Sequence, residues 1–283
     1  MDLYKLSVIK EICEKFGFSF SKGFGQNFLT DRNILEKIVE VSGVDKDCGV
    51  IEIGPGFGVL TKFLLEKADK VVSIEIDKRL KEVLDYTLAQ YDNFEFIEND
   101  ALKIDFERLI EEKFSNKKII LVANLPYYVT TPIITKLLES NLNLESITIM
   151  VQKEVAQRLV ADEKSKENSS ISLFVKYYAD AKLAFNVSRN VFVPAPNVDS
   201  AVVYMKLKKE RFKYENLMFK LIKNGFLNRR KTILNSFCKD GVEKEKLIEV
   251  LNYLNIDPKI RAEKLSLTDF QNIATKYTES CNV

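Results

Sequence analysis

The sequence predicts an α/β fold, with a mostly parallel seven-stranded sheet, helices on both of its faces, and a small all-helical C-terminal domain. Short runs rich in Val and Ile alternate with longer segments whose apolar residues recur every three or four positions, as strands alternating with helices do. Beyond about Lys209 the strand pattern stops. The expected strands are Gly49–Ile53, Lys70–Ile76, Asn93–Glu98, Lys118–Ala123, Ser146–Gln152, Ala179–Phe185 and Ala201–Leu207.

Helical spacing follows the first expected strand and returns in the tail. The residues that carry it are Val59, Leu60, Phe63 and Leu64, then Leu217, Leu221 and Ile222, then Leu247, Ile248, Leu251 and Leu254. We therefore expect a first domain at residues 1–208, with an N-terminal extension, and a helical domain at residues 209–283. The polar run Asp162–Ser170 is expected to form an exposed loop.

Several absences restrict the chemistry. The 283 residues include no histidine, which excludes Ser-His-Asp hydrolysis, Cys-His nucleophiles and H-E-x-x-H metal sites. No stretch of about 18 apolar residues occurs, and the first thirty positions mix charged with apolar residues. We expect no metal, no membrane span and a cytoplasmic location. The four cysteines lack metal or disulfide spacing: Cys13, Cys48, Cys238 and Cys281.

Positive charge is concentrated in one segment. Residues 206–231 hold ten Lys or Arg but only Glu210 and Glu215 as acids, although the whole chain carries a net charge of +2. A local excess of this kind favours a polyanion such as nucleic acid, with Arg229, Arg230 and Lys231 as candidate RNA contacts. The alternative is a solvated lysine-rich surface.

A cofactor site is predicted where the first strands end. The glycine-rich run Gly54–Gly58 follows the first strand, but Val59 breaks the dinucleotide pattern G-x-G-x-x-G. Glu75, at the end of the second strand, can accept hydrogen bonds from two ribose hydroxyls, and Asp100, after the third, can accept from an adenine amino group. Gly54, Gly56 and the two acids predict a pocket for an adenosine-bearing cofactor. A structural turn and a surface carboxylate are the alternatives.

The fourth strand leads into the most informative motif, Asn124-Leu125-Pro126-Tyr127. The asparagine amide oxygen and the carbonyl before Pro126 can both accept from an exocyclic amine, while the tyrosine ring can stack on the base that carries it. We expect Asn124, Pro126 and Tyr127 to form the catalytic turn. An ordinary turn is the competing interpretation.

A rigid proline-bracketed segment, Phe192–Ser200, precedes the last strand. Phe192 is expected to close the opposite face of a flipped base and is counted with the catalytic residues. A core phenylalanine is the alternative.

Together these segments resemble the KsgA/RsmA family of ribosomal RNA adenine dimethyltransferases along nearly the whole chain. The matching segments are Gly25–Leu29, Gly54–Gly58, Glu75, Asp100, Asn124–Tyr127, Phe192–Pro196, Arg229–Thr232 and Arg261–Ser266.

The resemblance implies a Rossmann-like class I methyltransferase sheet with S-adenosyl-L-methionine as methyl donor. It implies that Asn27 and Leu29 contact this cofactor beside Gly54, Glu75, Asp100 and Asn124. It further implies two methyl transfers to each of two adjacent adenines in a hairpin near the end of 16S ribosomal RNA, on an immature small subunit. A sulfonium methyl is a strong electrophile, so this chemistry needs no histidine. We expect a monomer, because the sequence contains no heptad pattern that could form a coiled-coil interface with a second copy.

Three other functions stay open at this point: a 23S ribosomal RNA adenine methyltransferase of the macrolide-resistance type, a non-catalytic RNA-binding assembly factor, and a small-molecule methyltransferase. The chain also departs from the family pattern in two places. Asn168-Ser169-Ser170 stands where many members have Tyr-Gly, which leaves the RNA contacts of that loop open, and Tyr128 often corresponds to Asn.

Overall fold

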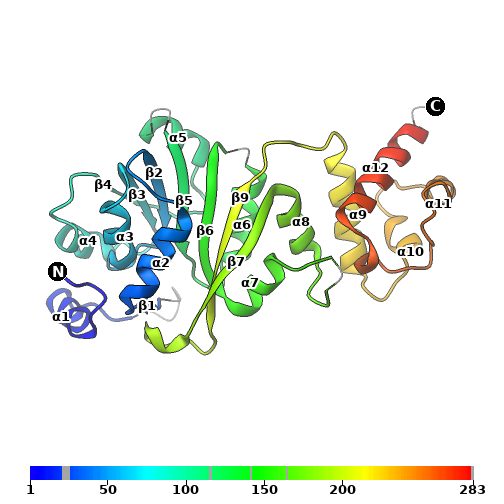
Figure 1. The fold of residues 1–283 in the computed structure, drawn as a ribbon. Coiled ribbons are helices and arrows are strands. Elements are labelled where there is room, and N and C mark those ends of the chain that lie inside the picture. The colour runs from blue at the N-terminus through cyan, green and yellow to red at the C-terminus, as the bar shows by residue number, and fades with distance from the viewer. Residues whose placement is uncertain (21–25, 115–116, 141, 164, 282–283) are drawn as a thin grey trace. The chain divides into compact units, whose positions relative to one another are not determined.

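The computed structural model describes residues 1–20, 26–114, 117–140, 142–163 and 165–281 (Figure 1). The chain forms two compact units, one of residues 1–156 and 181–207, the other of residues 157–180 and 208–283. The longer part of the second unit begins at Lys208. Residues 157–180, which fall in the expected first domain, group with the C-terminal residues instead.

The predicted seven-stranded sheet is confirmed, with the strand order β4-β3-β2-β5-β6-β9-β7. The strands from β4 to β6 are parallel, and β9 is antiparallel to β6. The bounds are β2 Cys48–Ile53, β3 Lys70–Glu75, β4 Phe94–Glu98, β5 Lys118–Asn124, β6 Leu144–Gln152, β7 Ala179–Val187 and β9 Ser200–Leu207.

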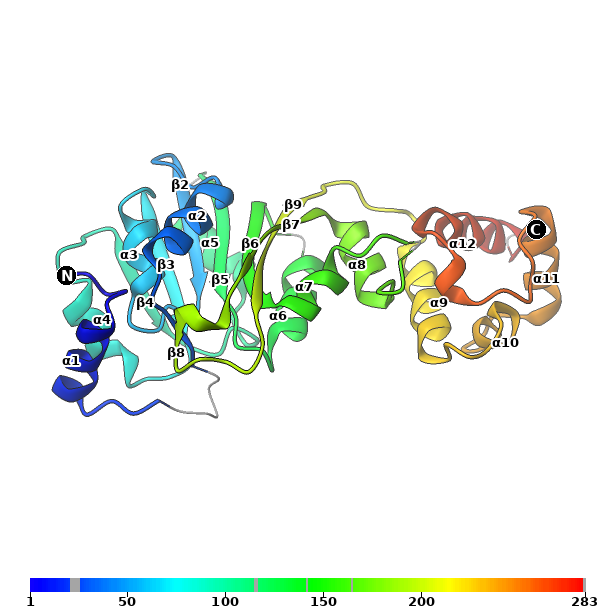
Figure 2. The ribbon, with the colours of Figure 1, turned by 60° about the horizontal axis from the view of Figure 1, so that its bottom comes forward.

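A second, two-stranded sheet was not predicted. β1 (Phe28–Leu29) pairs antiparallel with β8 (Phe192–Val193), so that Leu29 lies opposite Phe192. The backbone N–H of Thr30 extends the pairing by donating to the Val191 carbonyl at 2.8 Å. The connection between β7 and β9 that carries β8 is seen in yellow-green in Figure 2. Strands of two residues carry no readable alternation, which explains why the sequence pattern did not predict them.

Helices cover both faces of the large sheet. Val50, Ile120 and Val122 point to one face, where they join a core with buried side chains of α1 to α4. On the other face α5 and α6 lie behind the sheet in Figure 1, and Lys136 of α6 donates to the carbonyls of Leu102 and Ile104 beside α5. The helices are α1 Leu6–Phe16, α2 Arg32–Ser42, α3 Val59–Leu65, α4 Leu80–Thr87, α5 Phe106–Lys113, α6 Thr130–Glu139 and α7 Lys153–Leu159.

The chain changes direction across the sheet between β2 and β5. β2 to β4 build outward on one side, and β5 then returns to pair with β2 on its other side. In a parallel sheet the loops beyond the carboxyl ends of such neighbouring strands diverge and leave a crevice. The residues that follow β2, β3, β4 and β5 therefore meet at one edge.

A buried carboxyl group joins β2, β3 and α3 under this edge. Glu52 is 1% exposed, and its Oε2 accepts hydrogen bonds from Thr61 Oγ1 at 2.7 Å and from Ser73 Oγ at 2.6 Å. Burial raises the pKa of Glu52 to about 7, against the lowering effect of the two hydroxyl donors. The group that fixes this corner of the sheet therefore titrates near neutrality.

The second unit is helical around its own core. Its buried side chains include Met218, Leu221, Phe237, Leu251 and Phe270. No helix among the described residues is both long and apolar enough to cross a membrane. Its helices are α8 Ser170–Tyr178, α9 Glu215–Leu227, α10 Ile233–Phe237, α11 Lys244–Tyr253 and α12 Leu267–Cys281.

Asn168 is one of the residues that join residues 157–180 to this unit. The residue is 1% exposed, and its side-chain amide donates to the carbonyls of Glu163 at 2.9 Å and Glu263 at 3.2 Å. The Asn168 carbonyl accepts from Arg229 Nη2 at 2.9 Å. The expectation that the whole run Asp162–Ser170 is exposed is wrong at Asn168, because this amide satisfies backbone carbonyls inside the unit.

We expect Glu52→Gln to change how stability depends on pH. Because the pKa of Glu52 is raised from 4.5 to about 7, the folded state keeps a proton that the unfolded state releases within this window. The contribution of Glu52 to the free energy of unfolding therefore falls as pH rises from 4.5 to 7. Over that pH range the free energy of unfolding of the wild type should fall by up to about 3 kcal/mol relative to that of the variant. Urea unfolding of both proteins at several pH values measures this difference. The same pH dependence of the free energy of unfolding in both proteins would contradict the prediction.

Candidate functional site

The glycine-rich loop after β2 has a backbone that requires glycine. Gly54 and Gly56 adopt φ of 76° and 58°, in the left-handed region that other residues rarely occupy. The loop is anchored to β3, since the Gly54 N–H donates to the Ile74 carbonyl at 3.0 Å. A Cβ on Gly56 would lie 2.8 Å from the Phe28 ring. The loop backbone therefore packs directly against the N-terminal segment, with no space for a side chain.

The two predicted acids stand at the ends of neighbouring strands: Glu75 is the last residue of β3, and Asp100 follows β4. Glu75 Oε1 accepts from the backbone N–H groups of Ile76 at 2.9 Å and Asp77 at 3.0 Å. Burial raises the pKa of Glu75 above its usual value, although these backbone bonds oppose the shift. Asp100 Oδ1 accepts from the Leu102 N–H at 2.9 Å. Each carboxylate is thus oriented by the backbone of its own turn.

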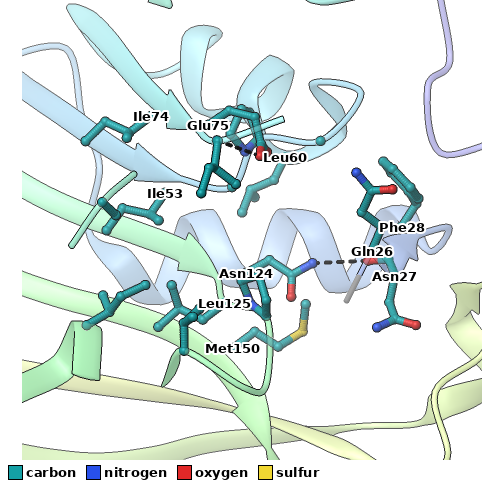
Figure 3. A pocket seen from close by; sticks show the side chains of 18 of the residues that line it. Gln26, Asn27, Phe28, Ile53, Leu60, Ile74, Glu75, Asn124, Leu125 and Met150 are labelled. Carbon is teal, nitrogen blue, oxygen red and sulfur yellow. Dashed lines mark hydrogen bonds between the residues drawn. The ribbon is translucent and has the colours of Figure 1, made fainter. Parts of the chain in front are cut away.

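Asn124 is the last residue of β5, and its amide is oriented by the N-terminal segment. Its Nδ2 donates to the Asn27 carbonyl at 3.3 Å, as the dashed line in Figure 3 shows. The turn that follows is held in place because the Leu125 N–H donates to the Met150 carbonyl at 3.2 Å, and the Pro126 carbonyl accepts from Val129 N–H at the same distance. With its nitrogen used in this way, the amide oxygen of Asn124 is the group available to accept from a ligand.

Tyr127 and Phe192 are fixed in different ways. The Tyr127 hydroxyl shares a hydrogen bond of 2.9 Å with Ser200 Oγ, and burial raises its pKa above the usual value, so it stays neutral near pH 7. Phe192 is 3% exposed and packs in the core cluster of the sheet face. Phe192 also lines the cavity described next. The two alternatives for this residue, a core side chain and a side chain of the site, are therefore compatible.

One cavity brings the predicted site residues together. Every residue predicted for the cofactor or for catalysis contributes to its lining: Asn27, Leu29, Gly54, Gly56, Glu75, Asp100, Asn124, Pro126, Tyr127 and Phe192. Figure 3 shows Asn27, Glu75 and Asn124 around the same space. Gly25, the first residue of the N-terminal match, lies outside the described residues. The roles of the lining residues stay predictions, while their convergence on one space is a feature of the structure.

The cavity has further walls that the sequence pattern did not single out. Gln26, Phe28, Tyr128 and Met150 line it as well. Gln26 and Phe28 stood inside a matching segment without an assigned role, and Tyr128 is 59% exposed at the cavity. No periodic or glycine signal marks such positions, because their place in the site depends on packing between distant segments.

The three predicted RNA contacts all lie in the second unit and are exposed. They differ in their partners. Arg229 is bound to the Asn168 carbonyl, and its Nε lies 3.9 Å from Glu263 Oε2. The Lys231 N–H donates to the Asn228 carbonyl, which involves only its backbone. Arg229 therefore has a structural role within its unit.

The structure also bears on metal binding and disulfides. In the described part of the chain, no group of three or more His, Cys, Asp or Glu side chains is arranged to hold a metal ion. All four cysteines are free thiols, with Cys48 buried and Cys281 exposed.

Comparison with known proteins identifies the family. The family model of the ribosomal RNA adenine dimethylases matches residues 17–279. The chain is 46% identical to ribosomal RNA small subunit methyltransferase A of Streptococcus thermophilus (strain CNRZ 1066), with 99% of both proteins covered. It is 48% identical to the protein of the same name from Bacillus pumilus (strain SAFR-032), with 94% of both covered.

Solved structures agree in fold. A dimethyladenosine transferase from Plasmodium falciparum is similar with a TM-score of 0.78 and 26% identity, over 90% of this chain and 98% of that one. The 23S rRNA methyltransferase ErmE is similar in fold with a TM-score of 0.69 and 22% identity, over 89% and 99%. With a family model that covers almost its whole length, this chain belongs to the ribosomal RNA adenine dimethylase family.

Proposed function

We propose that this protein transfers methyl groups from S-adenosyl-L-methionine to the 6-amino group of adenine in the 16S RNA of the small ribosomal subunit. We propose two transfers to each of two adjacent adenosines in the 3′-terminal hairpin, on an immature subunit, by a monomer. Membership of the adenine dimethylase family supports the reaction, and the names of the full-length relatives support the substrate. The single observation that carries it is the cavity, where Asn124-Leu125-Pro126-Tyr127 meets the glycine loop and the two acids.

The cavity residues fit the proposed cofactor. Glu75 can accept from the ribose hydroxyls and Asp100 from the adenine amino group, since both carboxylates are held by the backbone of their turns. Gly54 and Gly56 let the backbone approach a ligand, and Asn27 and Leu29 line the same cavity. When bound, this cofactor supplies an electrophilic methyl group on a sulfonium centre. The residues around it align the two reactants.

The turn after β5 would hold the target amine. The Asn124 oxygen and the Leu125 carbonyl can accept its two N–H groups, which draws the nitrogen lone pair away from the ring and directs it toward the methyl group. Tyr127 and Phe192 can contact the faces of a base that has left its stack, a step that costs a few kcal/mol. One N–H remains after the first transfer, so one acceptor can still orient the amine for the second.

The proposed substrate also needs phosphate contacts outside the cavity. We propose the helical second domain, residues 209–283, as the RNA-binding part, with Arg230 and Lys231 as exposed cations of the basic segment. The likeness to ErmE is one of fold, and the full-length relatives carry a small-subunit name, so a 23S target is not favoured. The intact acids and the Asn124 turn argue against a purely binding role.

Labelled methyl transfer to small subunits that lack the modification tests the proposal directly. We expect dimethyladenosine in the small-subunit RNA, identified by mass spectrometry of the product nucleosides. Transfer to large-subunit RNA instead would indicate the macrolide-resistance type of enzyme. Cofactor binding with no transfer to either RNA would favour a binding module.

Asn124→Ala should lower kcat for methyl transfer by about two orders of magnitude or more, because it removes an acceptor that acts in the transition state. RNA affinity, measured by fluorescence anisotropy, should stay unchanged. Asn33→Ala is the matched control, since Asn33 is exposed on α2. Near-normal turnover of the Asn124 variant would remove the proposed role of this residue.

Charge reversal in the basic segment should weaken RNA binding. We expect Arg230→Glu to lower the affinity for an RNA hairpin about tenfold at low salt and to reduce the salt slope by about 1. Lys244→Glu makes a matched change at an exposed position of the same unit, outside the basic segment. Arg229→Glu should additionally lower the unfolding temperature, because Arg229 binds the Asn168 carbonyl. An RNA affinity of Arg230→Glu equal to that of the wild type would contradict the proposed role of the basic segment.

A further inference from the structure

A buried carboxylate beside the cavity has no role in the proposed function so far. Asp77, in the turn after β3, is 2% exposed. Its Oδ2 accepts from Gln26 Nε2 at 2.8 Å and from Arg79 Nη2 at 2.6 Å, and its Oδ1 accepts from Arg79 Nε at 2.9 Å. The Arg79 N–H also donates to Oδ1, at 3.1 Å. A carboxylate with this many charge-assisted and amide donors is held in one orientation.

These bonds connect two chain segments that line the cavity. Through its backbone N–H, Asp77 donates to Glu75 Oε1 at 3.0 Å, which fixes the acid proposed for the ribose. Through its side chain, it holds Gln26, a cavity residue directly before Asn27. The Asn27 carbonyl in turn accepts from Asn124 Nδ2 at 3.3 Å. Figure 3 shows Gln26 and Asn27 to the right of the space, with Glu75 above it and Asn124 below.

Arg79 strengthens the attachment to the N-terminal part of the chain. Its guanidinium lies 4.6 Å from the centre of the Phe18 ring, and its Nη1 donates to the Ser19 carbonyl at 3.4 Å. Burial alone would raise the pKa of Asp77, but the hydrogen bonds from Arg79 and Gln26 hold it below its usual value. Asp77 is therefore ionised at neutral pH and binds Gln26 as a charged acceptor.

We propose that Asp77 is a positioning residue for the cofactor, acting through Gln26 to hold the N-terminal wall of the cavity against Glu75 and Asn124. The inference rests on the proposed function, because it concerns the same cavity. It assigns Asp77 and Gln26 a polar link between the turn after β3 and the N-terminal segment, in addition to the packing of Phe28 against Gly56. Asp77 contacts Gln26 and Glu75, and both of these residues line the cavity.

Isothermal titration calorimetry with S-adenosylhomocysteine tests the inference in Gln26→Ala, Asp77→Ala and the double variant. We expect each single substitution to raise the dissociation constant about tenfold, the effect of losing one charge-assisted hydrogen bond. The double variant should bind no more weakly than Asp77→Ala, because both changes break the same link. In methyl-transfer assays the KM for S-adenosylmethionine should rise with the dissociation constant, while kcat changes less.

Asp85→Ala is the matched control, because Asp85 forms an exposed ion pair with Lys81 on the neighbouring α4. It should bind S-adenosylhomocysteine like the wild type. Gln26→Ala should unfold at the wild-type temperature, which keeps the test decisive even if Asp77→Ala fails to fold. Wild-type affinity in Gln26→Ala, or fully additive effects in the double variant, would overturn this inference but leave the proposed function in place. Failure of the wild type to bind S-adenosylhomocysteine would overturn the proposed function and this inference with it.

Discussion

The parallel pairing of β2, β3, β4 and β5 is the constraint on which the rest of the first unit depends. Its register sets Ile53 opposite both Ile74 and Ala123, so these strands end at the same edge of the sheet. The glycine loop, the two acids and the Asn124 turn each follow one of these strand ends. The strand pairing therefore brings Gly54, Glu75, Asp100 and Asn124 together, although they are far apart in the sequence.

The N-terminal segment supplies what the parallel sheet cannot. It is held across the strand ends by three separate connections: Gln26 to Asp77, the Asn27 carbonyl to Asn124, and the ladder of β1 with β8. Phe28 adds packing against the backbone of Gly56. The cavity is thus a joint product of the sheet edge and of a segment that is attached both by polar bonds and by the burial of Phe28 and Leu29.

Much of this arrangement could be predicted from the sequence, for identifiable physical reasons. All seven strands of the large sheet were predicted to within two residues. Five of them, β2, β3, β5, β6 and β9, are largely buried runs with several Val or Ile residues, which differ clearly from helical periodicity. The acids followed from their positions at strand ends. The β1–β8 pair, the burial of Asn168 and the bond from Gln26 to Asp77 could not be predicted, because each depends on partners that no local pattern marks.

The ladder between β1 and β8 links two parts of the cavity mechanically. Leu29, on the proposed cofactor wall, lies opposite Phe192, on the proposed base wall, within one short antiparallel pair. A shift of either strand displaces the other, because the backbone hydrogen bonds between them fix their separation. A ligand that moves Leu29 would thus alter the affinity at Phe192, and thermodynamic reciprocity requires the reverse effect to have equal size. Two ligands bound to this cavity would therefore be coupled through the protein, in addition to their direct contact.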